Sequence, residues 1–382
     1  MSIKHPVADV SENTTWIRDR FLSHGYKMSN VLARIGIKEY RTWMYDPDMT
    51  EKISHFLSKK AGDELDILIR IFALNSTEKR ELAGKIFSES ELNLLAKMGV
   101  LSIGNKEYVS CDIALSECDG LLIATDSFIK AHPEINPVMP LIAEVYEFAA
   151  TRTRKKVEDT LDLCAGSGIH GLLAARHSHR VTCVDNNPRA IAFSKFNRAL
   201  NDIPNVEIIE GDLFSTLGEK TFDLILANPP YMPTRDSMPG DNFYCGGEKG
   251  DAISSKIISG VPRYLRKNGL CQIIHLMVCF DGRSMETWLR SNLGDHASRY
   301  SFLVMSNPVT PGDELTAKAS LVEWGVTNIK GNDNGAGSFY CHKPFIYPLD
   351  FDVHDLFEAL SLAGNDEERK DICATFQSYR NH

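Results

Sequence analysis

The sequence has few of the features that mark membrane, disulfide-stabilised or zinc-binding proteins. No apolar run approaches the length needed to cross a bilayer, and the first residues lack the apolar core of a signal peptide. The nine cysteines are scattered and odd in number, and none forms a Cys-x-x-Cys pair. We therefore expect neither a disulfide framework nor a metal site, and free thiols in a reducing cytosol fit this pattern best.

Positive charge is scarce as well. The 382 residues include 42 Lys and Arg against 51 Asp and Glu, which gives a formal net charge of −9. A broad basic face for duplex nucleic acid is therefore not expected, although a local basic patch would be hidden in this average. The chain is longer than one hydrophobic core usually spans, so its length predicts two domains.

Residues 1–118 are predicted to form a mainly helical domain that resembles a winged-helix module. Apolar residues recur at three- and four-residue spacing, and Ser88 to Glu91 has the pattern of a capping box. A Gly104-Asn105 turn between two short apolar segments predicts a β-hairpin. Few Lys or Arg lie on the last helix, so we favour substrate docking over DNA binding for this domain. The predicted helices cover 14–24, 28–35, 64–74, 76–87 and 88–98, and the hairpin covers 100–103 and 107–115.

Residues 119–150 are predicted to connect this domain to the next and to cover a cofactor pocket. The segment holds an expected strand at Leu121–Thr125, a cover that begins at Asp126-Ser127 and an expected helix at 140–151. At the other end of the chain, residues 331–382 are predicted to be a flexible loop followed by two helices.

From residue 157 on, strand and helix patterns alternate, which predicts a parallel sheet with crossover helices in a domain at 151–330. The last predicted strand is expected to close the sheet antiparallel. The strands expected here are Thr160–Cys164, Arg180–Asp185, Val206–Glu210, Phe222–Ala227, Leu270–Val278, Ser301–Met305 and Ser320–Thr327, and the helices are 169–177, 188–200 and 253–265.

A glycine-rich turn follows the first of these strands. Asp162 is followed by Gly166, Gly168 and Gly171, at the point where a helix is predicted to begin. Glycines let the backbone approach a ligand closely, and a helix N-terminus offers unpaired N–H groups. Alone, the Gly-x-Gly-x-x-Gly spacing is a weak signal, because dinucleotide enzymes and ligand-free tight turns use it too.

Two acidic residues follow at the ends of the next strands. Asp185 ends the second strand, 17 residues after Gly168, where a carboxylate can accept hydrogen bonds from both ribose hydroxyls. A second role for Asp185, as a helix N-cap before Pro188, is compatible with the first. Asp212 follows the third strand, and an aspartate that only stabilises a turn is the alternative there.

The most informative stretch is Asn228–Tyr231, Asn-Pro-Pro-Tyr, directly after the apolar strand Phe222–Ala227. Neither Pro229 nor Pro230 can donate to a sheet ladder, so the strand ends at the edge where open α/β sheets bind ligands. The Asn228 side-chain oxygen and the Pro229 carbonyl can accept two N–H bonds from a planar nitrogen. Tyr231 can stack on the planar group and fix its orientation.

Together, the glycine-rich turn and the Asn-Pro-Pro-Tyr run resemble the class I S-adenosylmethionine-dependent N-methyltransferases. Residues 158–280 resemble the branch of the release-factor glutamine N5-methyltransferases. The resemblance implies an α/β fold, a seven-stranded Rossmann-like sheet with its last strand antiparallel, and S-adenosyl-L-methionine as cofactor. It further implies that Asp212 accepts from the adenine amino group while Leu213 lies along the ring. Cys164 departs from the family, which usually has its first glycine here.

The site residues implied by this resemblance fall into two groups, and no metal ligand is among them. The cofactor-binding group is Asp162, Cys164, Ala165, Gly166, Gly168, Asp185, Asn186, Asp212, Leu213 and Asn228, and the catalytic group is Asn228, Pro229, Pro230 and Tyr231.

The expected activity is methyl transfer to a planar nitrogen of a protein side chain or of a small amino-acid-like metabolite. An amine of an RNA or DNA base ranks behind these acceptors because of the net charge. A winged-helix regulator that only senses S-adenosylmethionine is the non-enzymatic alternative, and the complete acceptor motif counts against it. A nicotinamide-dependent dehydrogenase would have no use for Asn-Pro-Pro-Tyr. The acceptor, the number of methyl groups transferred and the oligomeric state are left open.

Two features near the motif, a loop and a histidine, are not assigned to the predicted site. The loop Met232–Tyr244 is long and polar with aromatic residues at its end, so it is a candidate lid. His275 lies inside a predicted central strand, where packing in the core is favoured over catalysis.

Overall fold

A computed structural model describes residues 14–37, 48–104, 107–127, 136–232, 243–279, 284–309, 321–331 and 339–342, with a few isolated positions besides. Contacts divide the chain into two units. The first unit comprises Met1–Tyr146, Gly166–Ile169 and Asn187–Pro204, and the second comprises Glu147–Ala165, His170–Asn186 and Asn205–His382. In the described part of the chain, no helix is long and apolar enough to span a bilayer.

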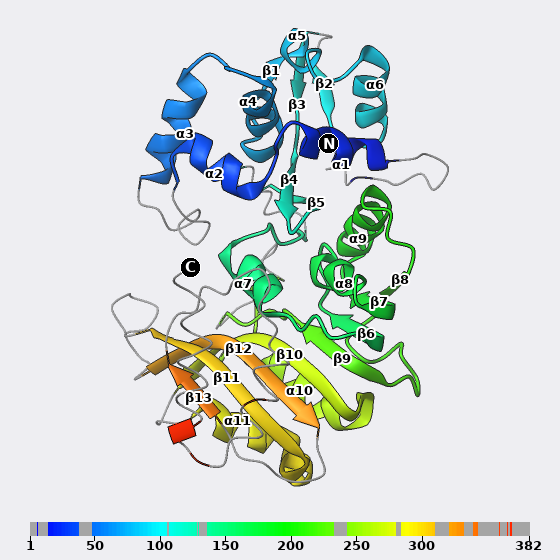
Figure 1. Ribbon diagram of the computed structural model, residues 1–382, viewed down its shortest axis with the longest axis vertical. Coiled ribbons are helices and arrows are strands. Elements are labelled where there is room, and N and C mark those ends of the chain that lie inside the picture. Colours follow the sequence, from blue (N-terminus) through cyan, green and yellow to red (C-terminus); the bar gives the residue numbers. More distant parts are fainter. Residues whose placement is uncertain are drawn as a thin grey trace. The chain divides into compact units, whose positions relative to one another are not determined.

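The second unit is built on one eight-stranded sheet, whose central strands can be followed in Figure 1. Five neighbouring strands, β10, β9, β6, β7 and β8, run parallel. Strand β12 is antiparallel to both β10 and β11, and β13 pairs in parallel with β11. The strands are β6 (Val157–Leu163), β7 (Ser178–Asp185), β8 (Val206–Glu210), β9 (Phe222–Ala227), β10 (Leu265–Cys279), β11 (Tyr300–Val309), β12 (Leu321–Gly331) and β13 (Phe339–His342).

The parallel sheet and the antiparallel strand β12 agree with the sequence analysis, but the expected count of seven strands is wrong. The structure adds β13, a four-residue strand that was not predicted, and β12 lies between β10 and β11 instead of closing the sheet. The bounds of β8 and β9 are as predicted, while β6, β7, β10, β11 and β12 are longer or shifted. A short strand such as β13 is stabilised mainly by its partner in the sheet, so its own sequence gives little signal.

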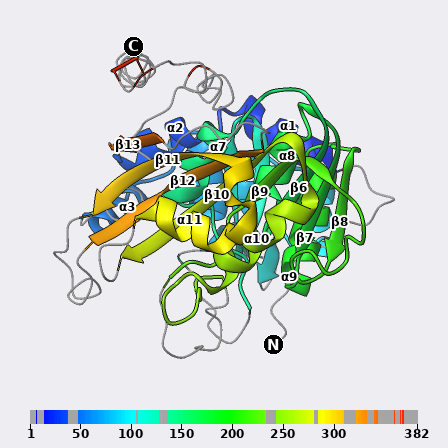
Figure 2. The same cartoon turned by 90° about the horizontal axis from the view of Figure 1, so that it is seen from below.

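Two helices pack on one face of this sheet, α10 (Ala252–Tyr264) and α11 (Met285–Leu293), as Figures 1 and 2 show. Their apolar side chains, among them Ile257 and Leu289, form one core cluster with Ile225 of β9 and Ile273 of β10. A 3₁₀ helix, Gly294–Arg299, leads from α11 into β11. Successive residues of β9 from Leu224 to Ala227 are all buried, so both faces of this strand are covered, which explains its nearly continuous apolar sequence.

The first unit is mainly helical and contains two small sheets. One sheet has the order β1-β3-β2, and the other is the antiparallel pair β4-β5. The capping box at Ser88 is present, since its hydroxyl accepts from the Glu91 N–H and the Glu91 carboxylate accepts from the Ser88 N–H. The elements are α1 (Thr15–Ser23), α2 (Met28–Ile35), α3 (Met49–Ser58), α4 (Glu64–Leu68), a π-helix (Ile69–Ala73), β1 (Glu78–Lys79), α5 (Arg80–Ala83), α6 (Glu89–Lys97), β2 (Ser102–Gly104), β3 (Tyr108–Ser110), β4 (Ile113–Cys118) and β5 (Leu121–Asp126).

Two predictions for this unit are wrong. Residues 76–87 do not form a capped helix, because Glu78 and Lys79 pair with Val109 and Tyr108 and leave only the single turn α5. The predicted second hairpin strand, 107–115, is divided between β3 and β4, and β4 pairs with β5. Both differences arise from strand pairings between distant residues, which local periodicity does not report.

Helix α9 (Pro188–Leu200) lies far along the chain but belongs to the first unit. Its Phe193 and Phe196 are fully buried in the same core cluster as Phe21. Asn197 accepts from the Ala124 N–H at 2.7 Å and donates to the Ala124 carbonyl at 2.9 Å. Asn201 makes the same pair of bonds with Leu122, at 3.0 and 2.8 Å. The two asparagines, one helical turn apart, thus make the backbone hydrogen bonds to β5 that a neighbouring strand would otherwise make.

Several remaining predictions concern the ends of elements or lie outside the described residues. Helix α7 (Ala143–Thr151) and helix α8 (Ile169–Ala174) are present but shorter than predicted. The predicted terminal helices, the loop at 332–338 and most of the predicted lid fall on residues that the structure does not describe.

Candidate functional site

The candidate site lies where the order of the parallel strands reverses. From β6 the chain proceeds outward to β7 and β8, then returns to β9 on the other side of β6. Leu163 of β6 is paired directly with Ala227 of β9. Because open α/β sheets bind ligands beyond the carboxyl ends of their strands at such a point, the chain places Cys164 and Asn228 at the binding edge.

Asp162 is fully buried one residue before the end of β6. Its Oδ2 accepts a 2.8 Å hydrogen bond from the Gly171 N–H, while its Oδ1 is buried without a partner among the described residues. Burial raises the pKa of Asp162 to about 7; the Gly171 bond acts in the opposite direction, and nearby Asp185 adds to the rise. A Cβ on Gly171 would lie 2.3 Å from Cys183 Sγ, so this close approach requires glycine.

The turn after β6 has a left-handed backbone at three positions. Cys164, Gly166 and Gly168 have φ values of +54°, +54° and +80°. Within the first unit, helix α9 holds this turn, since Ser194 Oγ donates to the Gly166 carbonyl at 2.8 Å and Asn197 donates to the Ser167 carbonyl at 2.9 Å. Cys164 therefore occupies a backbone conformation that is suited to glycine.

The predicted carboxylates of the second unit gather around Cys164. Burial raises the pKa of the Cys164 thiol, and the charges of Asp185, Asp162 and Asp212 raise it further. The thiol is therefore neutral at physiological pH, and a cluster of negative charge surrounds it. Such a cluster favours the binding of hydroxyl, amino or cationic groups.

Asp185 ends β7, and its carbonyl accepts a 2.9 Å hydrogen bond from Gly211, which follows β8. This bond brings the segment of Asp212 and Leu213 beside the end of β7. Asp185 is half-buried, whereas Asn186 and Asp212 are exposed. The predicted second role of Asp185 as a helix cap is wrong: Asn187 caps α9 by accepting from the Arg189 N–H at 2.9 Å.

At the end of β9, the acceptor motif presents an unpaired polar atom. Asn228 Oδ1 is buried and has no hydrogen-bond partner among the described residues. Pro229 is buried, while Pro230 and Tyr231 are half-buried. After the motif, the Met232 N–H donates to the Tyr244 carbonyl at 2.8 Å, and the Gly246 N–H donates to the Met232 carbonyl at 2.9 Å. The residues after the motif are thus tied to the N-terminal side of α10.

His275 is fully buried, as the sequence analysis expected. Its ring stacks on Trp288, and its Nδ1 lies 3.1 Å from Ser254 Oγ. No local pattern connects these three residues, because they come from three separate elements, α10, β10 and α11. Among the described residues there is no group of acidic, histidine and cysteine side chains suited to a metal ion.

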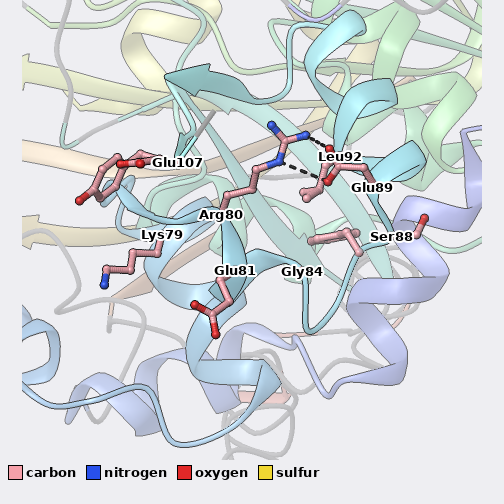
Figure 3. A pocket seen from close by; sticks show the side chains of 10 residues that line it. Lys79, Arg80, Glu81, Gly84, Ser88, Glu89, Leu92 and Glu107 are labelled. Atoms are coloured by element: carbon pink, nitrogen blue, oxygen red, sulfur yellow. Dashed lines mark hydrogen bonds and ion pairs between the residues drawn. The ribbon is translucent and has the colours of Figure 1, made fainter. Parts of the chain in front are cut away.

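A hollow in the surface lies in the first unit. A cavity of about 670 Å³ is formed by β1, α5, the start of α6 and β3. Figure 3 shows Arg80 extended across it to an ion pair with Glu89, with Lys79 and Glu107 to one side. Tyr108, another lining residue, is 43% exposed. The lining is mixed in charge and contains none of the predicted site residues.

Comparisons with known proteins found a matching family model and several relatives of this chain. Residues 147–294 match the family model described as the methyltransferase small domain. A provisionally named protein N5-glutamine methyltransferase from Methanocaldococcus jannaschii is 32% identical over 152 residues, which cover 38% of this chain and 74% of that protein. A release factor glutamine methyltransferase from Thermodesulfovibrio yellowstonii is 36% identical over 121 residues, covering 29% of this chain and 43% of that protein.

An uncharacterized RNA methyltransferase from Protochlamydia amoebophila is 37% identical over 109 residues, which cover 27% of this chain and 24% of that protein. The chain therefore spans about three quarters of the archaeal relative but less than half of the other two. In each case the matched part covers less than half of this chain.

Proposed function

Because the chain belongs to the S-adenosylmethionine-dependent methyltransferases, in the branch of the protein N5-glutamine methyltransferases, we propose that it methylates a side-chain amide nitrogen of a protein. A protein acceptor is supported by the names of two relatives, the archaeal protein N5-glutamine methyltransferase and the release factor glutamine methyltransferase. The number of methyl groups transferred does not follow from these relationships.

The observation that carries this proposal is the buried, unpaired Oδ1 of Asn228 at the end of β9. A buried acceptor without a partner costs about 1–3 kcal/mol, so it is retained where something other than the protein satisfies it. An amide N–H of the acceptor substrate is a suitable donor. The Pro229 carbonyl is the second acceptor in the proposed pair.

The residues at the sheet edge fit S-adenosyl-L-methionine. The glycine-rich turn through Gly166 and Gly168 would take the carboxypropyl end, and the unpaired Oδ1 of Asp162 can accept from a buried donor. Asp185 would accept from the ribose hydroxyls, and Asp212 with Leu213 would hold the adenine ring. Ala165, Asn186 and the backbone of Cys164 complete the proposed site.

When bound, S-adenosylmethionine supplies a methyl group on a sulfonium, which is already electrophilic. The protein therefore needs no strong general base. The difficulty lies in the acceptor nitrogen, whose lone pair is delocalised into its carbonyl group. Asn228 Oδ1 and the Pro229 carbonyl would accept its two N–H bonds and favour a pyramidal nitrogen with its lone pair toward the methyl carbon. Tyr231 would stack on the amide plane and Pro230 would fix the position of that ring.

For the first unit we propose a role in docking the acceptor protein. The support is a capped helix, α6, followed by the β2-β3 pair, an arrangement similar to a winged helix, and the cavity that Tyr108 and Glu107 line. We keep the predicted limits of this domain, 1–118, of the connecting segment, 119–150, and of the methyltransferase domain, 151–330, as part of the proposal. The scattered cysteines, none of them in a Cys-x-x-Cys pair, support a reducing, cytosolic location.

The test is transfer of labelled methyl groups from S-adenosylmethionine to three separated fractions of a cell extract: protein, RNA and small molecules. We expect label in protein, at a glutamine amide after digestion and mass spectrometry. Label confined to RNA would favour the second candidate, a base amine, which the RNA methyltransferase relative supports and the net charge of −9 opposes. Binding of S-adenosylmethionine without transfer to any fraction would favour the regulator instead.

A further inference from the structure

Beyond the acceptor motif, four side chains from three elements of the second unit form one connected group. Ser254 Oγ lies 3.1 Å from Nδ1 of His275, the His275 and Trp288 rings stack at 4.6 Å with 10° between their planes, and Trp288 Nε1–H donates to Asp251 Oδ2 at 3.2 Å. Ser254 and His275 are fully buried, and Trp288 is nearly so. Asp251 and Ser254 stand at the N-terminal end of α10, so the group connects that end of the helix to β10 and α11.

The group adjoins the segment Tyr244–Ala252, which is hydrogen-bonded to Met232 directly after the acceptor motif. The Met232 N–H donates to the Tyr244 carbonyl, the Gly246 N–H donates to the Met232 carbonyl, and the Ala252 N–H donates to the Gly246 carbonyl at 2.9 Å. A Cβ on Gly246 would lie 2.3 Å from the Gly250 carbonyl oxygen, so the chain between Gly246 and Asp251 is tightly folded. Whatever fixes Asp251 and Ala252 therefore also fixes the residues beside Met232.

In the register of the sheet, residue His275 also stands near the start of the motif. Ile273 of β10 pairs with Ala227 of β9, so His275 and Pro229 are each two residues beyond a paired position on adjacent parallel strands. Burial lowers the pKa of His275 to about 3, so the ring is neutral at physiological pH. Its Nε2 is buried with no partner in the described part of the chain. A side chain needed only to fill this space would be apolar, because an unpaired buried nitrogen is unfavourable.

We propose that Asp251, Ser254, His275 and Trp288 form a positioning network that holds the segment Tyr244–Ala252, and through Met232 the acceptor motif, in the geometry needed for methyl transfer. None of the four residues is assigned contact with the cofactor or the acceptor. The inference rests on the proposed function for its effect on turnover, but its effect on the segment can be measured without any acceptor.

The first experiment compares two serines on the same helix. Ser254→Ala removes the hydroxyl beside His275, whereas Ser259→Ala removes an exposed hydroxyl that donates to the Asn292 carbonyl near the other end of α10. Hydrogen–deuterium exchange of the full-length protein should speed up about tenfold at Met232, Gly246 and Ala252 in Ser254→Ala. Strand β9 should be unchanged in both variants, and Ser259→Ala should match the wild type. Equal protection of the three amides in Ser254→Ala and the wild type would overturn the network.

The second experiment separates positioning from binding. Trp288→Phe keeps a ring over His275 but removes the bond to Asp251, so kcat with a glutamine-containing peptide should fall about tenfold. Affinity for S-adenosylmethionine, measured by calorimetry, should not change. Asp251→Asn retains an oxygen that can accept from the indole and should keep most of the turnover that Asp251→Ala loses. Equal losses in Asp251→Asn and Asp251→Ala, or a parallel loss of cofactor affinity, would contradict positioning.

The two proposals fail in different ways. If wild-type protein does not methylate the peptide, the proposed acceptor is wrong, and the exchange experiment alone still decides whether the network holds the segment. The wild type could instead be active while Ser254→Ala exchanges at the normal rate and Trp288→Phe turns over at the normal rate. The network is then wrong and the proposed function stands.

Discussion

Two pairs of buried polar side chains, one pair in each unit, are used in opposite ways. In the first unit, Asn197 and Asn201 pair their side-chain oxygens and nitrogens with the backbone of β5. In the second unit, Asn228 and Asp162 each keep a buried oxygen without a partner in the described part of the chain. The first pair has the pattern of groups that stabilise a fold, and the second has the pattern of groups that receive a ligand.

The largest expected effect is on catalysis at Asn228. Asn228→Ala should lower the single-turnover rate of methyl transfer by two or more powers of ten, because a comparable oriented contact in a transition state contributes about 2.7–4 kcal/mol. Asn228→Asp should be milder, since a carboxylate still accepts. Affinity for S-adenosylmethionine and the melting temperature should change little. If Asn228→Ala loses stability and not turnover, its role is the same as that of Asn201 and the comparison fails.

Next in size is the cofactor affinity of Asp185→Ala. Loss of hydrogen bonds between a charged group and a ligand should weaken S-adenosylmethionine binding by about 1.5–3 kcal/mol, measured by calorimetry. The fold should be preserved, because the Asp185 backbone carbonyl still accepts from Gly211. Glu207→Ala, which removes an exposed carboxylate of β8 outside the proposed site, is the control. Unchanged affinity in Asp185→Ala would remove the carboxylate from the site.

Asn201→Ala should show the opposite behaviour to the Asn228 variants. The change leaves the backbone N–H and carbonyl of Leu122 unpaired in a buried position, at a cost of about 1–3 kcal/mol for an unsatisfied group. We expect a lower free energy of unfolding in urea together with normal methyl transfer at 25 °C. Normal stability in this variant would mean that the bonds to β5 contribute little.

The smallest expected effect is a gain in stability from Cys164→Gly. Cys164 has φ +54°, a conformation that costs a residue with a side chain about 1–2 kcal/mol. The greater freedom of glycine in the unfolded chain offsets part of the gain, so we expect about 1 kcal/mol or less. Chemical denaturation measures it, and Cys164→Ala is the control that removes the thiol without relieving the strain. A gain in Cys164→Ala of the same size would assign the effect to the thiol.

The sequence alone determined the features that depend on neighbouring residues. Apolar runs ended by proline or glycine located β8, β9 and α9 at their observed bounds, and the Ser88–Glu91 spacing located a capping box. It also placed Asp162, Asp185 and Asn228 at the carboxyl ends of parallel strands, because each residue lies at or next to the last residue of an apolar strand segment. The tertiary structure decided what depends on distant partners. It divided residues 76–87 between β1 and α5, and it brought Asn197 and Asn201 to β5. It left Asn228 Oδ1 unpaired and joined His275 to Trp288. Whether a buried polar atom is satisfied depends on every atom around it, and those atoms come from segments that no local pattern relates.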